Sequence, residues 1–252
     1  MPHLSVSKLS TLLPFGCFFW ARNSKEKLPS SEQNGQAIRV FTAFPNVLKG
    51  AEWVGNPLRQ AFTTQATPAV RFAGRSGPLQ VLVVGGSLGA KALNDTVPQA
   101  LALIPQAQRP QVVHQSGAKQ IDALRAAYAA AGVEATLTPF IDDTASAFAQ
   151  ADLVICRAGA STVTEIAAVG AAAIFVPFPF AVDDHQTTNA RFLVEQGGGW
   201  LLPQADLTAQ SLAARLQQLT REQLLACAEK AHQQRKMNAT REVVVACEEL
   251  AA

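Results

Sequence analysis

The chain has 252 residues, of which 48% are hydrophobic and 16% are charged. This composition excludes a disordered protein, and the length accommodates one large domain or one domain with part of another. The formal net charge is +2, but residues 1–77 carry nine Lys and Arg against three Asp and Glu. A basic N-terminal segment suits an anionic membrane surface or a phosphorylated substrate as well as it suits solvated side chains. We expect no nucleic-acid partner.

The four cysteines, Cys17, Cys156, Cys227 and Cys247, lie far apart and form no C-x-x-C pair. This spacing argues against a zinc site and favours reduced thiols. We therefore expect no bound metal.

Residues 1–30 differ from the rest of the chain. The apolar run from Leu12 to Trp20 contains Pro14 and Gly16 and is too short to span a bilayer. It is interpreted as a membrane-interface segment, as the remnant of an incomplete domain, or as sequence outside the fold. Residues 31–77 contain short strands at 38–41 and 52–54, and a domain linker is predicted over 65–78.

From residue 78 onward, apolar strands alternate with helical patterns. Strands are predicted at 81–84, 111–114, 135–140, 152–156, 172–176 and 200–202, with helices ending near 104 and spanning 119–131 and 143–150. A polar loop follows residue 176, and three C-terminal helices begin near Leu207, Arg221 and Ala239. The alternation predicts an α/β domain with a doubly wound parallel sheet, which binds ligands beyond the carboxyl ends of its strands.

The stretch from Asp152 to Asn189 predicts a phosphate site. A turn of Arg157 and the small residues 158–160 precedes a helix, and Thr162 with Glu165 has the spacing of a capping box. A turn without bulk lets an anion approach the positive end of a helix dipole. Glu165 is interpreted either as a cap or as an acceptor for ribose hydroxyls.

Three other motifs are weak when taken alone. Gly85–Gly89 follows a strand, and the Ser87 hydroxyl can donate to phosphate, but the spacing fits neither a dinucleotide fingerprint nor a P-loop. Residues 183–186 (DDHQ) suit a metal, acid–base chemistry or sugar hydroxyls. His114 at a strand end is interpreted as a structural residue rather than a catalyst.

Taken together, the motifs resemble one family from about Glu32 to the C-terminus. This is the bacterial undecaprenyldiphospho-muramoylpentapeptide N-acetylglucosaminyltransferases of glycosyltransferase family 28, which add N-acetylglucosamine to lipid I in peptidoglycan synthesis. The motifs are NPLR (56–59), GGSLGA (85–90), HQSG (114–117), PFID (139–142), RAGASTVTEIA (157–167) and DDHQTTNA (183–190).

The resemblance implies a GT-B fold, in which two Rossmann-like domains enclose a cleft. Residues 78–252 would form the C-terminal domain that binds UDP-N-acetylglucosamine. Residues 31–77 would be what remains of the N-terminal domain, which binds the undecaprenyl-linked lipid I acceptor and associates with the cytoplasmic face of the membrane. The implied reaction inverts the anomeric centre and uses no metal or other cofactor.

The resemblance also implies roles for individual residues. Ile141 would contact uracil and Glu165 the ribose hydroxyls, while Ser87 and the backbone of residues 161–163 would hold the diphosphate. The Ala160 backbone and Gln186 would address the glucosamine hydroxyls. Completing the predicted UDP-sugar site are Asn34, Arg59, Ser161, Thr162, Val163 and Thr164.

The chain departs from the family in its N-terminal part. The G-G-T-G-G-H loop, which is expected to hold the acceptor diphosphate and the histidine closest to catalysis, is absent, and residues 1–30 show none of the motifs. Ser31 and Phe180 stand where many members have His. The general base is therefore unassigned. Two alternatives stay open, a UDP-sugar-binding module without turnover and a donor half that works with a separate membrane partner.

Overall fold

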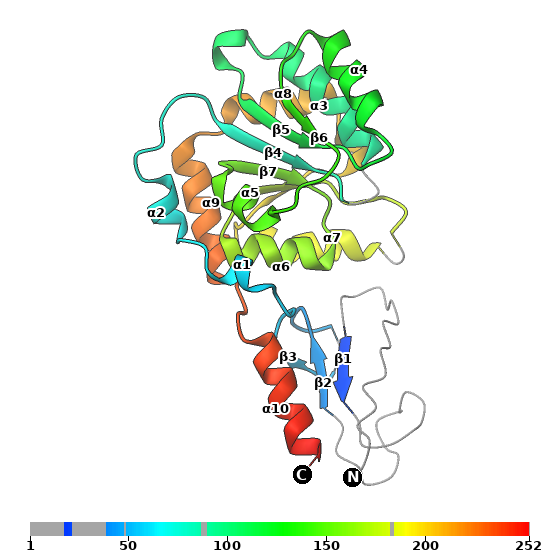
Figure 1. The fold of residues 1–252 in the computed structure, drawn as a ribbon, viewed down its shortest axis with the longest axis vertical. Helices are drawn as coiled ribbons and strands as arrows, with labels where there is room; N and C mark the ends of the chain where they lie inside the picture. The colour runs from blue at the N-terminus through cyan, green and yellow to red at the C-terminus, as the bar shows by residue number, and fades with distance from the viewer. Residues whose placement is uncertain (1–17, 22–38, 48, 87–89, 182–183, 252) are drawn as a thin grey trace.

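The structure is a computed structural model that describes residues 18–21, 39–47, 49–86, 90–181 and 184–251. Figure 1 shows a large unit, in which helices flank a central sheet, and a smaller unit beneath it that contains a short sheet and the C-terminal helix.

The central sheet has the predicted parallel arrangement. Its strands are β4 (Gln80–Val84), β5 (Gln111–Gln115), β6 (Thr136–Thr138), β7 (Leu153–Cys156), β8 (Ala173–Phe175) and β9 (Trp200–Leu201). All neighbouring pairs are parallel, in the order β6-β5-β4-β7-β8-β9. The direction in which strands are added reverses between β4 and β7, and such a switch point is where doubly wound sheets bind ligands.

Helices cover both faces of this sheet. Successive residues of β4 point to opposite faces and therefore pack against different helices. Val81 and Val83 pack with α3 (Lys91–Leu103), α4 (Ile121–Ala131) and α8 (Ala209–Gln218). Leu82 packs with α5 (Thr144–Gln150), α6 (Ala160–Val169) and α7 (His185–Val194). Helix α9 (Arg221–Gln233) contributes to both core clusters. Two short 3-10 helices span Gln106–Gln108 and Gln204–Asp206.

Two local predictions were wrong. Helix α6 begins at Ala160 after Gly159, which makes no side-chain cap, so Thr162 and Glu165 do not form a capping box. The polar loop predicted through residue 189 ends at Asp184, and α7 begins at His185. Helix α7 is stabilised by the packing of its inward face, where Ala190 and Leu193 are buried. Its mostly polar sequence gives little indication of this packing.

The smaller unit is built from both ends of the chain. Strand β1 (Phe18–Ala21) pairs antiparallel with β2 (Arg39–Thr42), which pairs in parallel with β3 (Glu52–Trp53). Helix α10 (Ala239–Ala251) returns to this unit (Figure 1), where it contacts β1. The Arg39 guanidinium bonds Glu52 and Glu249, each at 2.8 Å.

The segment predicted as a linker is docked on the large unit. It follows α1 (Gln60–Thr63) and contains α2 (Pro68–Phe72), which packs against α9. Arg71 donates to the carbonyl oxygens of Val169 at 2.9 Å and Gly170 at 2.5 Å, at the C-terminal end of α6. A cation there compensates the negative end of the helix dipole. Burial lowers the pKa of Arg71 to about 10, so it stays charged at neutral pH.

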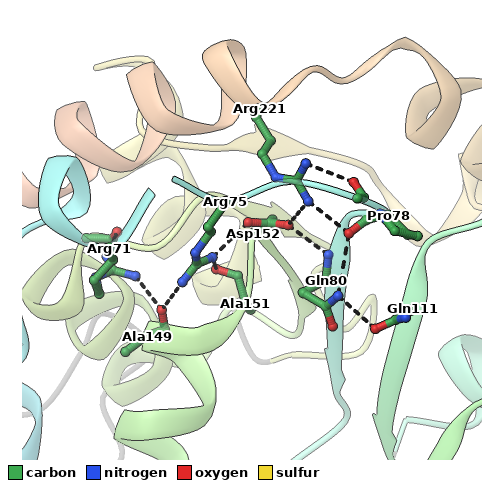
Figure 2. Close-up of polar contacts among 11 residues, drawn as sticks. Arg71, Arg75, Pro78, Gln80, Gln111, Ala149, Ala151, Asp152 and Arg221 are labelled. Atoms are coloured by element: carbon green, nitrogen blue, oxygen red, sulfur yellow. Dashed lines mark hydrogen bonds and ion pairs between the residues drawn. The ribbon is translucent and has the colours of Figure 1, made fainter. Parts of the chain in front are cut away.

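Asp152 connects the linker, the sheet and α9. Its carboxylate is fully buried and accepts from Arg75 Nη1 at 2.7 Å, Arg221 Nη2 at 3.2 Å and the Gln80 backbone nitrogen at 2.8 Å (Figure 2). These contacts lie at the amino end of β7, opposite the edge where ligands are expected.

We expect Asp152→Ala to destabilise the fold by about 3 kcal/mol, because it leaves two partly buried guanidinium groups without their carboxylate. Asp95→Ala is the matched control: Asp95 pairs with Lys91 on an exposed helix face, and the loss should be about 0.5 kcal/mol or less. Urea unfolding of both variants measures the difference. Equal losses would contradict the anchoring role of Asp152.

Candidate functional site

The candidate site lies at the carboxyl ends of β4 and β7, on either side of the switch point. Strand β4 runs into Gly85-Gly86, and Gly86 has a φ of 82°, in the left-handed region that glycine adopts without strain. Strand β7 runs into the turn of residues 157–159, which opens α6. Gly85-Gly86 and Ala158-Gly159 therefore present backbone with little side-chain bulk to the same edge of the sheet. The Arg157 side chain is bound nearby, where its guanidinium donates to the Val176 and Pro177 carbonyls at 3.0 Å each.

The N-terminus of α6 presents small residues. Ser161 is exposed, and Ala160 and Thr162 are half-buried. The Val163 N–H donates to the Gly159 carbonyl at 3.0 Å and closes the first turn. The backbone N–H groups ahead of Val163 have no acceptor within the helix, so Ala160, Ser161 and Thr162 can offer theirs to an anion. Val163 is fully buried, and its N–H is already used.

Side chains of α7 hold the turn before α6. Gln186 Oε1 accepts from the Ala158 nitrogen at 3.3 Å and from the Phe178 nitrogen at 3.0 Å, and Asn189 Nδ2 donates to the Ala158 carbonyl at 3.1 Å. Because Oε1 already accepts two hydrogen bonds, we expect the amide nitrogen of Gln186 to make the predicted contact with the sugar. Asn189 was not predicted as a site residue. Its place in the polar motif at 183–190 is the signal that the sequence offers, and its burial is visible only in the structure.

Glu165 is a half-buried carboxylate beside this turn. Its side chain is 20% exposed, and Arg59 Nη2 approaches its Oε1 at 3.9 Å. Burial raises the pKa of Glu165 to about 7, and the charge of Arg59 opposes that rise. Because α6 begins at Ala160, Glu165 lies beyond the first turn and does not cap the helix. We therefore interpret the carboxylate as an acceptor for a ligand rather than as a helix cap.

Residues between β3 and α1 approach α6 at this point. Asn56 is buried and donates to the Thr164 hydroxyl oxygen at 3.3 Å, and that hydroxyl donates to the Ala160 carbonyl at 3.0 Å. Thr164 therefore has internal partners, and its predicted ligand contact gains no support from this geometry. The exposed Arg59 side chain rests on the Phe62 ring, with its guanidinium carbon 5.0 Å from the centroid.

The remaining predicted residues lie apart or outside the described chain. Ile141 is half-buried after β6, packed beside the core cluster that contains α5 and α6. Asn34 and Ser87 lie outside the described residues, as does Asp183. Ile141 and the start of the loop after β4 are nevertheless brought to the same sheet edge as α6.

A cavity of about 660 Å³ lies elsewhere, along edge strand β9 and helices α8 and α9. Its walls include Trp200, Arg215 and Lys230, and none of the predicted site residues contributes to it. We assign the site at the carboxyl ends of β4 and β7 from its chemistry rather than from this cavity.

Residues 80–245 match the sequence model of the glycosyltransferase family 28 C-terminal domain. This chain belongs to glycosyltransferase family 28. The match covers the central sheet and the helices that flank it. The predicted α/β fold of a GT-B donor domain is therefore confirmed.

Curated relatives are similar over most of the chain. Two of them, from Paracidovorax citrulli and Albidiferax ferrireducens, are named UDP-N-acetylglucosamine–N-acetylmuramyl-(pentapeptide) pyrophosphoryl-undecaprenol N-acetylglucosamine transferase. The first is 70% identical over 92% of this chain, and the second is 60% identical over 98%. The second alignment thus extends into residues 1–30, where motifs were not recognised. The family 28 chain spans 65% and 64% of these two relatives.

Solved structures agree with the fold. The crystal structure of Acinetobacter baumannii MurG is 40% identical with a TM-score of 0.75, covering 83% of this chain and 59% of that one. The calicheamicin glycosyltransferase CalG4 is 17% identical with a TM-score of 0.52, covering 80% and 47%, which supports the fold alone.

The raised pKa of Glu165 predicts that uridine binds the family 28 chain more weakly at pH 6 than at pH 8. Between these pH values the charged fraction of Glu165 falls from about 90% to about 10%, and the charged form accepts ribose hydrogen bonds best. Uridine carries no phosphate that would titrate in this range. Calorimetry should show affinity falling several-fold.

Glu165→Gln serves as the control for this pH dependence and should abolish it. The same variant should stabilise the free protein at pH 8, because burial penalises the charged carboxylate above its folded-state pKa. A pH profile for uridine that is identical in both proteins would contradict the role of Glu165.

Proposed function

We propose that this chain binds UDP-N-acetylglucosamine and is the donor-binding part of an inverting hexosyltransferase that adds N-acetylglucosamine to lipid I, giving lipid II in peptidoglycan synthesis. The names of the two curated relatives support the donor and the acceptor. Membership in family 28 supports the reaction type.

One observation carries this proposal, the proximity of Glu165 to the N-terminus of α6. The Glu165 carboxylate does not cap the helix, and a carboxylate can accept hydrogen bonds from the two hydroxyls of a ribose. The backbone N–H groups of a helix N-terminus with small residues can donate to a diphosphate. A nucleoside diphosphate contains both groups, close together. Arg59, which lies immediately before α1 and approaches Glu165, adds a positive charge on the same side.

The proposed reaction is a displacement at the anomeric carbon. An acceptor hydroxyl forms the new glycosidic bond while the bond to the UDP oxygen breaks, and the acceptor proton passes to a general base. Negative charge grows on the departing diphosphate, so fixed N–H donors at Ala160, Ser161 and Thr162 stabilise the transition state more than the ground state. We assign no base among the described residues, and we propose that the reaction uses no metal or other cofactor.

The proposed place of action is the cytoplasmic face of the membrane, in peripheral association with it. The undecaprenyl chain of the acceptor and the basic N-terminal segment support this assignment. Within the part of the chain that the structure describes, no helix is both long and apolar enough to cross a bilayer.

A second candidate function is donor binding without turnover in this chain alone. The absence of a G-G-T-G-G-H loop from the sequence favours it, since that loop is expected on the acceptor side. Transfer of N-acetylglucosamine to a lipid I analogue by the isolated chain would exclude this alternative.

Calorimetric titration with UDP and UDP-N-acetylglucosamine tests the proposal. We expect both to bind, and Glu165→Ala to weaken UDP by about tenfold or more, because a hydrogen bond to a charged group contributes roughly 1.5–3 kcal/mol. Glu134→Ala, at an exposed position away from the site, is the control and should leave the affinity unchanged. No heat with either ligand would refute the proposed function.

A further inference from the structure

Gln115 bridges two loops of the candidate site. It is the last residue of β5 and is 3% exposed. Its Nε2 donates to the Gly86 carbonyl at 3.0 Å and to the Pro139 carbonyl at 3.2 Å. Both hydrogens of one buried amide are therefore used to join the loop after β4 to the loop after β6.

The position of β5 makes this bridge possible. It lies between β4 and β6 in the sheet, so a side chain at its carboxyl end reaches the loops on both sides. Each hydrogen bond fixes a carbonyl and, because the peptide group is planar, the plane of that peptide. The Gly86 peptide belongs to the glycine turn after β4, at the same sheet edge as the N-terminus of α6 that is proposed to hold the diphosphate. The Pro139 peptide lies two residues before Ile141, which is proposed to contact the base.

His114 supplies a second anchor on the neighbouring side. Asn94 donates to the Ser116 carbonyl and to Gln120, so its Oδ1 faces His114 Nε2 at 3.0 Å and accepts from it. His114 Nδ1 then accepts from the Tyr128 hydroxyl at 3.0 Å. The imidazole is fully buried and uncharged, since burial lowers its pKa to about 3. This network holds the first turn of α3, into which the loop after β4 runs.

We propose that Gln115 is a positioning residue that couples the Gly85-Gly86 turn, on the diphosphate side of the site, to residues 139–142, the base loop, so that the two loops are arranged together for one nucleoside diphosphate. The side chain is buried and acts through the two carbonyls it binds rather than by touching the ligand. This inference rests on the proposed function, because it requires that both loops contact the same nucleotide.

The coupling predicts a selective loss. Gln115→Met keeps the length of the side chain and removes both donors. UDP spans both loops, so its affinity should fall by about tenfold, whereas uridine and inorganic pyrophosphate, which each meet one loop, should change by about threefold or less. Gln111→Met is the matched control: Gln111 lies at the other end of β5, where its exposed side chain accepts from Gln80 (Figure 2). It should leave all three affinities within about twofold.

The outcomes separate the two proposals. If the unmodified chain binds no UDP, the proposed function fails and this inference fails with it. If the unmodified chain binds UDP and Gln115→Met binds it equally well, or loses affinity for all three ligands to the same extent, the coupling alone is wrong.

A measurement on the unmodified protein covers the case in which Gln115→Met does not fold. In ¹⁵N-labelled protein, uridine should shift the amide resonance of Gly86 as well as those of Phe140 and Ile141, because Gln115 transmits the ordering of the base loop. Shifts confined to the base loop would overturn the coupling.

Discussion

The parallel alignment of six strands is the constraint on which the rest of the structure depends. Because every strand of the large unit runs the same way, the turns after β4 and β7 and the loop after β6 meet at one edge. The Gly85-Gly86 and Ala158-Gly159 segments lie side by side there because β4 and β7 are neighbours. At the opposite edge, the buried carboxylate of Asp152 binds two arginines (Figure 2).

Helix α6 connects this framework to the chemistry. Arg71 binds the carbonyls at its C-terminal end, so the negative end of its dipole is compensated by the protein itself. Its N-terminal end is left to a ligand, and α7 fixes the turn that precedes it. Between the ends, Thr164 and Glu165 meet Asn56 and Arg59. One helix thus carries the proposed diphosphate contact, the proposed ribose contact and the link to the smaller unit.

Much of the fold was predictable because its signals are local. Buried parallel strands are short apolar runs, and all six were predicted within a few residues. The capping box was wrong because Gly159 starts α6 without a side-chain bond, and α7 was missed because its packing lies on one narrow face. The raised pKa of Glu165 depends on burial among residues distant in sequence. Gln115 and Asn189 lie inside recognised motifs, yet their partners lie 24 to 31 residues away.

We propose that one nucleoside diphosphate binds across the carboxyl ends of β4 and β7. A crystal structure of the chain with UDP would test this binding mode. We expect the diphosphate at the N–H groups of Ala160, Ser161 and Thr162, with the ribose hydroxyls on the Glu165 carboxylate. UDP bound instead in the cavity beside Trp200 and Lys230, with the α6 N-terminus unoccupied, would contradict it.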